Sequence, residues 1–542
     1  DNVGNVWTAT EGGQIDRNGH QVSGGGTTVL LLDYNRTIYT EYTMSGRNLW
    51  FSWNGSSWTY LGLHGDPRGS GTVLNGACGA SNGATLSSVP STNLCSAGAI
   101  SAVSGSGPWS WSCGGSSGGA SAQCLAPLMG HFGRSIPATL FGMQTHGPQD
   151  TWPTVSFGIM GKGSHTIWPY VEPSRGVWDW SALDQYVAAT AAHNISFMYT
   201  FEGIPAWAIS GASTATCGTL YTGQLMCASL PNNMADWTNY VTTLVTRYCP
   251  GGVPKIQYYE LWNEPYDVYG TKLVQLSPAA LAKLTHAAYG IIRSKCPAAK
   301  ILTPDFSTVP GSSYATSTYT SIAAYAPAYF SALGPVGTDP ADIAAVHIYT
   351  YNQAVNKPED IIPDGSLNSA TTNSVFAKYV PGKPIWNTEG SWLGDTGLFA
   401  SNDLHAAFIA RWYILHWAAG YESANWYAWD DGADGTLCGG LHSPCTVLST
   451  IPTTAYTQTY NWLVGKIMSN GCSKASDGVT WSCKLAGPNG YTGLIVWDTA
   501  GSKSYTPPSA SLYKQYRDLS GKTTGYSGGA VTIAVKPILL EN

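Results

Sequence analysis

The sequence predicts an α/β chain in which a (β/α)8 TIM barrel follows small all-β and disulfide-rich modules and precedes a β-sandwich. Three observations carry this prediction. The 542 residues exceed what one hydrophobic core usually supports, so several domains are expected. Apolar strand-like runs alternate with amphipathic helical patterns between about 130 and 465. Twelve cysteines fall into groups that are close in sequence.

Composition and charge exclude several classes of protein. Hydrophobic residues make up 43% of the chain and charged residues 11%, with 63 glycines, which is typical of folded domains with many loops. The net charge of −6 comes without a basic run, so we expect no nucleic-acid partner. The chain has no run of about 18 apolar residues, so no membrane span is expected. Residues 1–8 do not resemble a signal peptide, and we expect a mature or trimmed chain.

Two small modules are predicted before the barrel. Residues 1–64 contain short strand patterns with turn signals, such as Thr27 to Tyr34, and indicate an all-β module. Its aromatic cluster is expected to serve stability more than sugar binding, and consists of Trp50, Trp53 and Trp58. Residues 65–126 are rich in Gly and Ser and have too little apolar mass to fold without cross-links. Three pairings are open for the cysteines of this module, Cys78, Cys95, Cys113 and Cys124.

The remaining cysteines also indicate disulfides. They lie in local pairs, Cys217 with Cys227, Cys249 with Cys296, Cys438 with Cys445, and Cys472 with Cys483. No pair has CxxC spacing and no HExxH motif is present, so we expect no metal site. Disulfides form outside the cytosol, which predicts a secreted, extracellular protein.

Residues 127–470 are predicted to form the barrel. One helix should begin at Ser277-Pro278 and end at Cys296-Pro297, with an apolar stripe of Leu281, Leu284, Ala288 and Ile291. Seven candidate strands suit an eight-stranded barrel: Thr139 to Thr145, Ile195 to Phe201, Lys255 to Leu261, Lys300 to Asp305, Ile343 to Tyr349, Pro384 to Thr388 and Ala424 to Trp429.

Residues 471–542 are predicted to form the β-sandwich. The runs Thr492 to Trp497 and Val531 to Val535 are strand-like and have no helical pattern between them. The Pro507-Pro508 pair does not suit a central strand, so we expect a loop there.

Two glutamates stand in informative settings within the barrel. The segment Tyr258-Tyr-Glu-Leu-Trp-Asn-Glu-Pro265 brings Asn263 and Glu264 to the carboxyl end of a strand, and Lys383-Pro-Ile-Trp-Asn-Thr-Glu-Gly390 does the same for Glu389. Active sites of such barrels lie at these strand ends. Hydrolysis of a glycosidic bond needs one carboxylic acid to protonate the leaving oxygen and one carboxylate to attack or to activate water.

These segments resemble a known group of enzymes. Trp262-Asn263-Glu264-Pro265 and Trp386-Asn-Thr-Glu389-Gly are similar to the two catalytic strands of clan A glycoside hydrolases. Three further phrases make the resemblance closest to glycoside hydrolase family 39, over roughly residues 130 to 540: the segment Glu172 to Asp184, Ile204-Pro-Ala-Trp207 and His347-x-Tyr349. The phrase Gly105-Ser-Gly-Pro-Trp-Ser-Trp-Ser-Cys113 resembles modules of secreted bacterial hydrolases.

The resemblance implies a role for each matching residue. Glu264 would be the catalytic acid/base and Glu389 the nucleophile of a retaining mechanism. Asn263 would bind the substrate 2-hydroxyl. The other expected substrate-site residues are His347, which would support the site, Tyr349, which would bond the nucleophile, Trp429, which would stack beneath the sugar, and His146, which would contact a hydroxyl. Core roles remain alternatives for His347 and Trp429, because histidines on apolar strands and buried tryptophans are common.

One position departs from the family pattern. Related enzymes usually have an arginine at the end of the second strand, and the segment Ser156-Phe-Gly-Ile-Met-Gly-Lys162 has Gly161 there. The usual cation near the nucleophile is then missing, unless Lys162 takes its place.

The sequence therefore predicts a monomeric or loosely associated bacterial enzyme without a cofactor. It would act on β-linked glycosides of plant or microbial polysaccharides or oligosaccharides. The first activity that we expect is that of a β-xylosidase. Two alternatives stay open: an endo-acting hydrolase of the same clan, and a non-catalytic carbohydrate-binding or adhesion protein.

Overall fold

The computed structural model divides into two compact units, which are described separately. Unit 1 comprises residues 1–82, 91–102 and 111–124, and unit 2 comprises 83–90, 103–110 and 125–542. The structure describes residues 4–10, 14–22, 27–44, 47–62, 75–82, 90–104, 109–115, 120–126, 133–147, 152–214, 216–220, 223–266, 268–269, 272–273, 276–307, 322–335, 339–349, 358–361, 375–391, 401–430, 437–438, 445 and 450–542.

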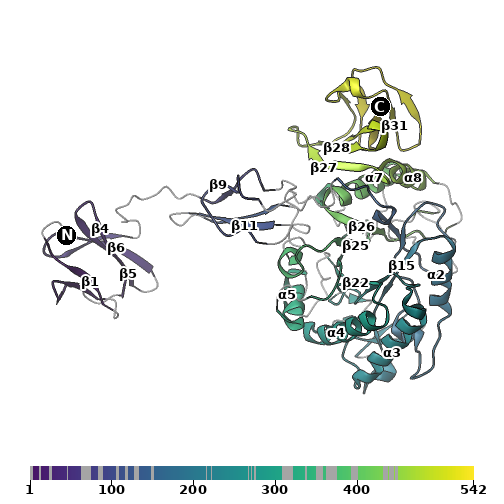
Figure 1. Cartoon of the computed structure of the whole chain (residues 1–542), viewed down its shortest axis with the longest axis horizontal. Coiled ribbons are helices and arrows are strands. Elements are labelled where there is room, and N and C mark those ends of the chain that lie inside the picture. The colour runs from purple at the N-terminus through teal and green to yellow at the C-terminus, as the bar shows by residue number, and fades with distance from the viewer. Residues whose placement is uncertain are drawn as a thin grey trace. The chain divides into compact units, whose positions relative to one another are not determined.

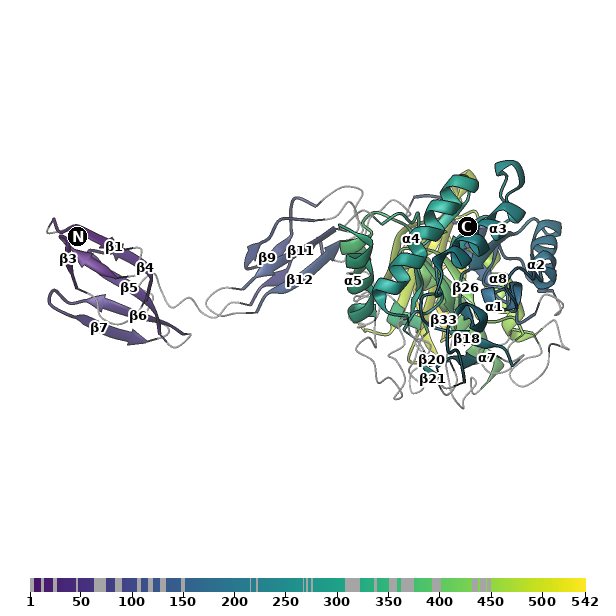
Figure 2. The ribbon, with the colours of Figure 1, turned by 90° about the horizontal axis from the view of Figure 1, so that it is seen from below.

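The N-terminal region forms two antiparallel sheets, as the alternating pattern predicts. A three-stranded sheet contains β1 (Trp7–Ala9), β2 (Ile15–Arg17) and β3 (His20–Gln21). A four-stranded sheet contains β4 (Thr27–Tyr34), β5 (Thr37–Met44), β6 (Arg47–Trp53) and β7 (Trp58–Gly62), which run next to one another (Figure 2). Trp7, Trp53 and Trp58 pack edge to face with ring centroids 5.2–5.9 Å apart. The aromatic rings therefore contact one another, in line with a role in stability.

The four-cysteine module contains five short strands and two disulfides. The strands are β8 (Ala77–Cys78), β9 (Cys95–Ala97), β10 (Ala99–Ile100), β11 (Trp109–Gly114) and β12 (Ala122–Ala126). The bonds Cys78–Cys124 and Cys95–Cys113 select one of the three pairings that the sequence leaves open. Along β11 every second side chain is buried, namely Trp109, Trp111 and Cys113.

A parallel sheet closes into the barrel. Its strands are β13 (Phe141–Met143), β14 (Ile159–Met160), β15 (Ser196–Thr200), β19 (Tyr258–Glu260), β22 (Lys300–Leu302), β23 (Phe306–Ser307), β24 (Ala344–His347), β25 (Ile385–Gly390) and β26 (Tyr421–Trp426). The spatial order is β22-β19-β15-β14-β13-β26-β25-β24-β23. β22 and β23 are two parts of the fifth barrel strand, and the parallel bridge Leu302–Ile343 joins the two edges of the sheet. This arrangement fits the predicted (β/α)8 barrel.

Helices cover the outside of the barrel (Figure 1). They are α1 (Trp168–Val171), α2 (Ser181–Ala192), α3 (Met234–Tyr248), α4 (Pro278–Lys295), α5 (Ile322–Leu333), α7 (Asn402–Ala418) and α8 (Ile451–Leu463). The predicted helix is α4, where the Ser277 hydroxyl accepts a hydrogen bond from the Ala280 amide as N-cap. Its buried stripe ends at Ile292, while Ile291 is only half-buried, so the predicted stripe was wrong by one residue at this end.

The predicted strands correspond to barrel strands, with shifted ends. The first strand covers only Phe141–Met143, because Ala138–Leu140 forms a 3-10 turn. The last strand ends at Trp426, so Trp429 lies beyond it. The seven predicted strands do not include β14, whose two residues are too few for a periodic pattern.

Shorter elements connect and flank these strands. They are the 3-10 turns η1 (Ala138–Leu140), η2 (Ala206–Ala208), η3 (Pro250–Gly252), η4 (Pro358–Ile361), η5 (Pro488–Gly490) and η6 (Ala510–Leu512), and the strands β16 (Ile204–Pro205), β17 (Gly218–Thr219), β18 (Leu225–Cys227), β20 (Val268–Tyr269) and β21 (Lys272–Leu273).

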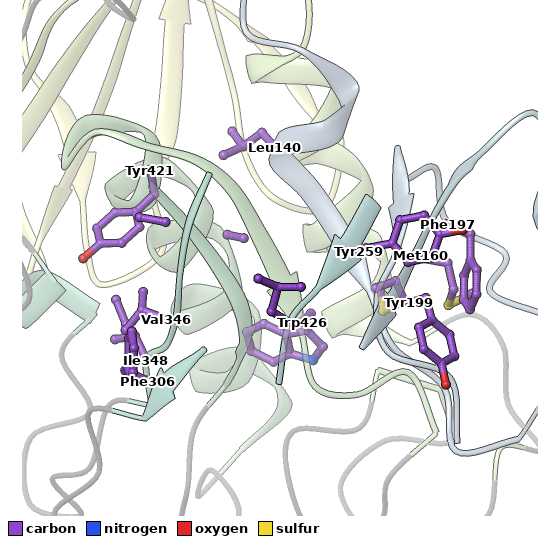
Figure 3. Packing of buried hydrophobic residues seen from close by; sticks show 14 of the residues in the cluster. Leu140, Met160, Phe197, Tyr199, Tyr259, Phe306, Val346, Ile348, Tyr421 and Trp426 are labelled. Carbon is purple, nitrogen blue, oxygen red and sulfur yellow. The ribbon is translucent and has the colours of Figure 1, made fainter. Parts of the chain in front are cut away.

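The main hydrophobic core lies between the barrel strands and their helices. Tyr199 and Phe197 from β15 and Tyr259 from β19 group on one side of Figure 3, with Trp426 from β26 beside them. Each of these four side chains is fully buried. Burial of such aromatic groups is worth about 1.5–3 kcal/mol each, so packing fixes the strand positions that carry the site.

The C-terminal module is built from antiparallel strands. A six-stranded sheet has the order β27 (Ile467–Lys474), β28 (Thr480–Ala486), β29 (Thr492–Asp498), β34 (Ile538–Glu541), β31 (Gln515–Arg517) and β32 (Thr523–Gly525), and a ribbon contains β30 (Lys503–Tyr505) and β33 (Val531–Ile533). Trp497 donates from Nε1 to Glu359 Oε1 at 2.7 Å, and Arg411 of α7 pairs with the same oxygen at 2.9 Å. These bonds join the module to the barrel; its description as a sandwich stays a prediction.

The predicted local disulfide pairs are present, namely Cys217–Cys227, Cys249–Cys296, Cys438–Cys445 and Cys472–Cys483. They fit an oxidising compartment. Within the described ranges, the helices are all too short or too polar to cross a membrane.

Candidate active site

Each barrel strand delivers polar side chains to the same end of the barrel, because parallel strands share their carboxyl ends. These residues are Gln144 and His146 after β13, Lys162 after β14, Glu202 after β15, Asn263 and Glu264 after β19, Asp305 between β22 and β23, His347 and Tyr349 at the end of β24, Glu389 in β25, and Tyr427 and Trp429 after β26.

Glu264 lies four residues beyond β19 in an unusual backbone conformation. Its φ is +35°, in the left-handed region, where a residue other than glycine costs about 1–3 kcal/mol. The Glu264 amide donates to Asp305 Oδ1 at 2.7 Å, and the preceding Asn263 amide donates to the Phe201 carbonyl at 3.1 Å. These bonds hold the turn that directs the Glu264 carboxylate into the barrel mouth.

Glu389 is held by the neighbouring strands. Tyr349 donates its hydroxyl proton to Glu389 Oε1 at 2.5 Å. The next residue must be glycine, because a Cβ on Gly390 would lie 2.2 Å from the Ile348 carbonyl oxygen. On the other side, Gln144 Nε2 donates to the Thr388 carbonyl at 2.9 Å. The strand is thus fixed on both sides of the carboxylate.

His347 connects the two glutamates. Its Nδ1 lies 2.7 Å from Glu264 Oε1 and 3.8 Å from Glu389 Oε1, and its Nε2 lies 3.1 Å from Asp305 Oδ2. One oxygen of Glu264, one of Glu389 and a ring nitrogen of His347 all lie within 4.8 Å of one another. The structure therefore brings together four residues that the sequence predicts for the site, Glu264, Glu389, His347 and Tyr349.

The electrostatics make His347 a cation. Burial alone would lower its pKa, but the carboxylates of Asp305, Glu389 and Glu264 outweigh burial and raise the pKa well above the ordinary value. For Tyr349, burial and the negative charge of Glu389 raise the pKa well above its usual range, so the hydroxyl keeps its proton and remains a donor.

A second charged pair lies beside the glutamates. Lys162 Nζ is 2.7 Å from Glu202 Oε2. Burial would lower the pKa of Lys162, but Glu202, Glu389 and Glu264 raise it, so the ammonium stays charged. Burial raises the pKa of Glu202 despite its cationic partner. Gly161 has no room for a side chain, since a Cβ there would lie 2.8 Å from Gln144 Cγ.

Two groups of buried side chains have the composition of metal ligands, namely Glu264 with His347 and Glu389, and Glu260 with Asp305 and His347. His347 belongs to both groups. A metal-binding imidazole must be neutral, whereas both nitrogens of this ring face carboxylates. The donor set therefore fits a protonated histidine better than a metal ligand.

His146 and Trp429 occupy different surroundings. His146 Nδ1 is 3.1 Å from Asp430 Oδ1 and its Nε2 is 2.8 Å from the Tyr427 hydroxyl, and the side chain is 38% exposed. Tyr427 contributes to the raised pKa of Tyr349, so this network borders the main cluster. Trp429 is fully buried and packs within the core, and its stacking on a sugar stays a prediction.

Sequence reasoning missed several residues of the site. Asp305 was included only as the last residue of a predicted strand, and Glu202 and Tyr427 were not singled out. The available signal was position: each follows a barrel strand by a few residues, where functional side chains are expected.

Comparison with known proteins places the fold. Searches with protein-family models and against curated proteins each found no match. Among solved structures, a bifunctional glucanase-xylanase from a metagenome library is similar with a TM-score of 0.51 at 13% identity, covering 75% of this chain and 96% of that one. A family 39 β-xylosidase from Caulobacter crescentus has a TM-score of 0.49 at 13% identity, with 75% and 97% covered.

A family 30 subfamily 8 xylanase from Clostridium acetobutylicum has a TM-score of 0.46 at 14% identity, with coverage of 75% and 96%. At such identities the likeness to the glucanase-xylanase shows the fold alone. Family 39 is one of several families among the similar structures, so membership in it stays a prediction.

Proposed function

We propose that the protein is a retaining glycoside hydrolase in which Glu264 is the acid/base and Glu389 the nucleophile. The observation that carries this proposal is the approach of the two carboxylates, with one oxygen of each within 4.8 Å of the other. Retaining enzymes have carboxyl groups about 5–5.5 Å apart, whereas inverting enzymes need about 6.5–9.5 Å to admit a water.

The surroundings of the two carboxylates suit different roles. Glu389 accepts a hydrogen bond from the Tyr349 hydroxyl and lies near the cation of His347, which favours a carboxylate ready to attack. Glu264 stands on a turn at the barrel mouth and is 8% exposed, so an incoming glycosidic oxygen can reach it. The charged Lys162 near Glu389 supplies the cation that related enzymes have as an arginine at the position of Gly161.

The reaction would take two steps. Glu264 gives its proton to the leaving oxygen while a Glu389 oxygen bonds to the anomeric carbon, which breaks the glycosidic bond and forms a glycosyl-enzyme. In the second step Glu264, now a carboxylate, takes a proton from water, and the hydroxyl oxygen replaces Glu389 at the anomeric carbon. The anomeric configuration is retained and both side chains return to their starting states.

The substrate class follows from the resemblance and the fold. We infer a β-linked glycoside of a plant or microbial polysaccharide or oligosaccharide, with β-xylosidase-like action first. Asn263 would bind the 2-hydroxyl, and Trp429 and His146 would contact the sugar. The disulfides support a secreted enzyme. Product lengths would distinguish this action from an endo-acting hydrolase.

Hydrolysis of a panel of β-linked aryl glycosides and polysaccharides tests the proposal. We expect the wild type to cleave one class, with the Glu264→Gln and Glu389→Gln variants each at least about 10³-fold slower. Glu422→Gln is the matched control, because Glu422 pairs with Arg134 at the surface. A 2-deoxy-2-fluoro glycoside of the cleaved class should leave a covalent adduct on the peptide that contains Glu389.

Two results would refute the proposal. An adduct on another residue, or full activity of either glutamine variant, would remove the two-glutamate mechanism. Binding of polysaccharide with no hydrolysis across the panel would instead favour the non-catalytic binding protein.

A further inference from the structure

Asp305 occupies a break in the fifth barrel strand. Pro304 has no amide proton to continue the ladder, and β22 ends at Leu302 while β23 begins at Phe306. The Asp305 amide donates to the Trp262 carbonyl at 3.0 Å, which ties the break to the end of the fourth strand. The side chain is fully buried at 0% exposure. A buried carboxylate requires partners: Oδ1 accepts a backbone amide, and Oδ2 lies 3.1 Å from His347 Nε2 as an ion pair rather than as a hydrogen bond.

The first oxygen supports the backbone of Glu264. Asp305 Oδ1 accepts the Glu264 amide at 2.7 Å, at the residue whose φ is +35°. Charge-assisted bonds of this kind are stronger than neutral ones, so the bond offsets part of the strain at that turn. The position of the Glu264 carboxylate thus depends on a side chain from the neighbouring strand.

The second oxygen holds the charge of His347. Asp305 Oδ2 lies 3.1 Å from Nε2, and the opposite nitrogen lies 2.7 Å from Glu264 and 3.8 Å from Glu389. Glu260 is a further titratable group close to the ring, and its carboxylate groups with Asp305 and His347 within 4.8 Å. Carboxyl groups beside both nitrogens favour the imidazolium, which carries a proton on each nitrogen.

We propose that Asp305 is a positioning residue that keeps His347 protonated and orients it, so that the imidazolium bonds Glu264 and places its charge beside Glu389. The inference rests on the proposed function for its effect on catalysis. The charge of His347 lies nearer to Glu264, so it stabilises the carboxylate that Glu264 becomes after giving up its proton. The same charge stabilises Glu389 as an anion in the free enzyme.

The variant Asp305→Asn separates the two roles of Asp305. The Asn oxygen can still accept the Glu264 amide, but the Asn NH2 faces His347 Nε2 and forces that nitrogen to become an acceptor. His347 is then neutral. We expect kcat to fall by about 100-fold with a smaller change in KM. The pH–rate profile should change as well, because a positive charge beside the two glutamates is lost.

Asp342→Asn is the matched control. Asp342 Oδ2 also accepts a backbone amide, that of Ile301 at 2.9 Å, and also pairs with a cation, Arg293 at 2.6 Å. It lies at the opposite end of the fifth strand from the glutamates. This variant should leave kcat and the pH–rate profile unchanged.

Nitrogen NMR of ¹⁵N-histidine-labelled full-length protein tests the charge directly, with the His347 signal assigned by its loss in His347→Gln. In the wild type at pH 8, both His347 nitrogens should have imidazolium shifts; in Asp305→Asn, one should have the shift of an unprotonated nitrogen. This readout does not require hydrolysis. If the shifts behave as expected but no glycoside is cleaved, the proposed function fails while the charge assignment stands.

Either of two results would overturn the inference. One is a neutral His347 in the wild type at pH 8. The other is an Asp305→Asn enzyme with kcat within about threefold of wild type and an unshifted pH–rate profile.

Discussion

The mouth of the barrel and the layer between β25 and α7 each contain a buried histidine, and one is charged whereas the other is neutral. His347 is 1% exposed and His416 is 0% exposed. Asp305, Glu389 and Glu264 raise the pKa of His347, whereas burial lowers the pKa of His416 to about 3. Burial is therefore the same in both regions and cannot decide the charge.

The hydrogen-bond partners of each histidine decide its charge. His416 Nε2 is 2.8 Å from Asn387 Nδ2, and its Nδ1 is 2.8 Å from the Trp412 carbonyl oxygen. Asn387 Oδ1 already accepts the Ile348 amide, so the amide NH2 must face the ring and donate to it. His416 then accepts at one nitrogen and donates at the other, which only the neutral ring can do. At His347 carboxylates stand at both nitrogens.

Removal of the anion at the barrel mouth should have the largest effect on stability. Asp305→Ala leaves the Glu264 amide and the His347 charge without this partner in a buried place. We expect a loss of about 3–5 kcal/mol in the free energy of unfolding at pH 7, measured by urea unfolding of the full chain. A loss below about 1 kcal/mol would mean that His347 is not held as a cation.

The stability of the protein should fall at low pH because His416 is neutral in the folded state. The folded-state pKa of His416 is lowered, so below about pH 6.5 the unfolded chain binds a proton that the folded protein refuses until about pH 3. Stability is therefore lost as pH falls through this window, by up to about 1.4 kcal/mol per pH unit for this group. The His416→Gln variant should show a correspondingly shallower decline between pH 6 and 4 in urea unfolding; equal slopes would contradict a neutral His416.

Asn387→Asp should give His416 the positive charge that His347 has. A carboxylate at this position would favour the His416 imidazolium and raise its pKa. A raised pKa stabilises the folded state below about pH 6.5, and this stabilisation is lost as the pH rises through the folded-state pKa. When the pH is lowered from 8 to 6, the variant should therefore gain about 1–2 kcal/mol in the free energy of unfolding relative to wild type. Unfolding at the two pH values checks the sign, and Asn387→Leu is the uncharged control.

A surface ion pair should have the smallest effect. Lys536 pairs with Asp403 at 2.7 Å, but the two side chains are 45% and 59% exposed. Lys536→Ala should change the free energy of unfolding by less than about 0.5 kcal/mol and should become neutral in 0.5 M salt. A larger loss would show that this contact is needed to attach the C-terminal module.

The sequence was sufficient for the barrel and for selecting two glutamates that the structure brings together, because both depend on local pattern. Apolar runs with strand length correspond to barrel strands, and Asn-Glu-Pro and Thr-Glu-Gly mark strand ends. His347 and Tyr349, which bond those glutamates, were also predicted, whereas Asp305 was harder to predict. Asp305 approaches Glu264 from a position 41 residues away, and its role depends on a strand break that no periodicity describes.

The disulfides also divide into those that the local sequence predicts and those that depend on long-range contacts. Pairs that stand alone in sequence were assigned correctly, since each has one near neighbour. The pairing within the four-cysteine module depends on which strands lie side by side, and β8 pairs with β9 while β10, β11 and β12 form a separate sheet. The pairing of strands that are distant in the sequence therefore determines these two disulfides.

The bond between Cys249 and Cys296 has a consequence for a chain that meets proteases. It joins the residue after α3 to the residue after α4, 47 positions apart, and Glu264 lies between them. This stretch is thus a covalent loop. A single cut of the backbone anywhere between 250 and 295 would leave both pieces attached through sulfur, so a nicked molecule would separate into fragments only after reduction.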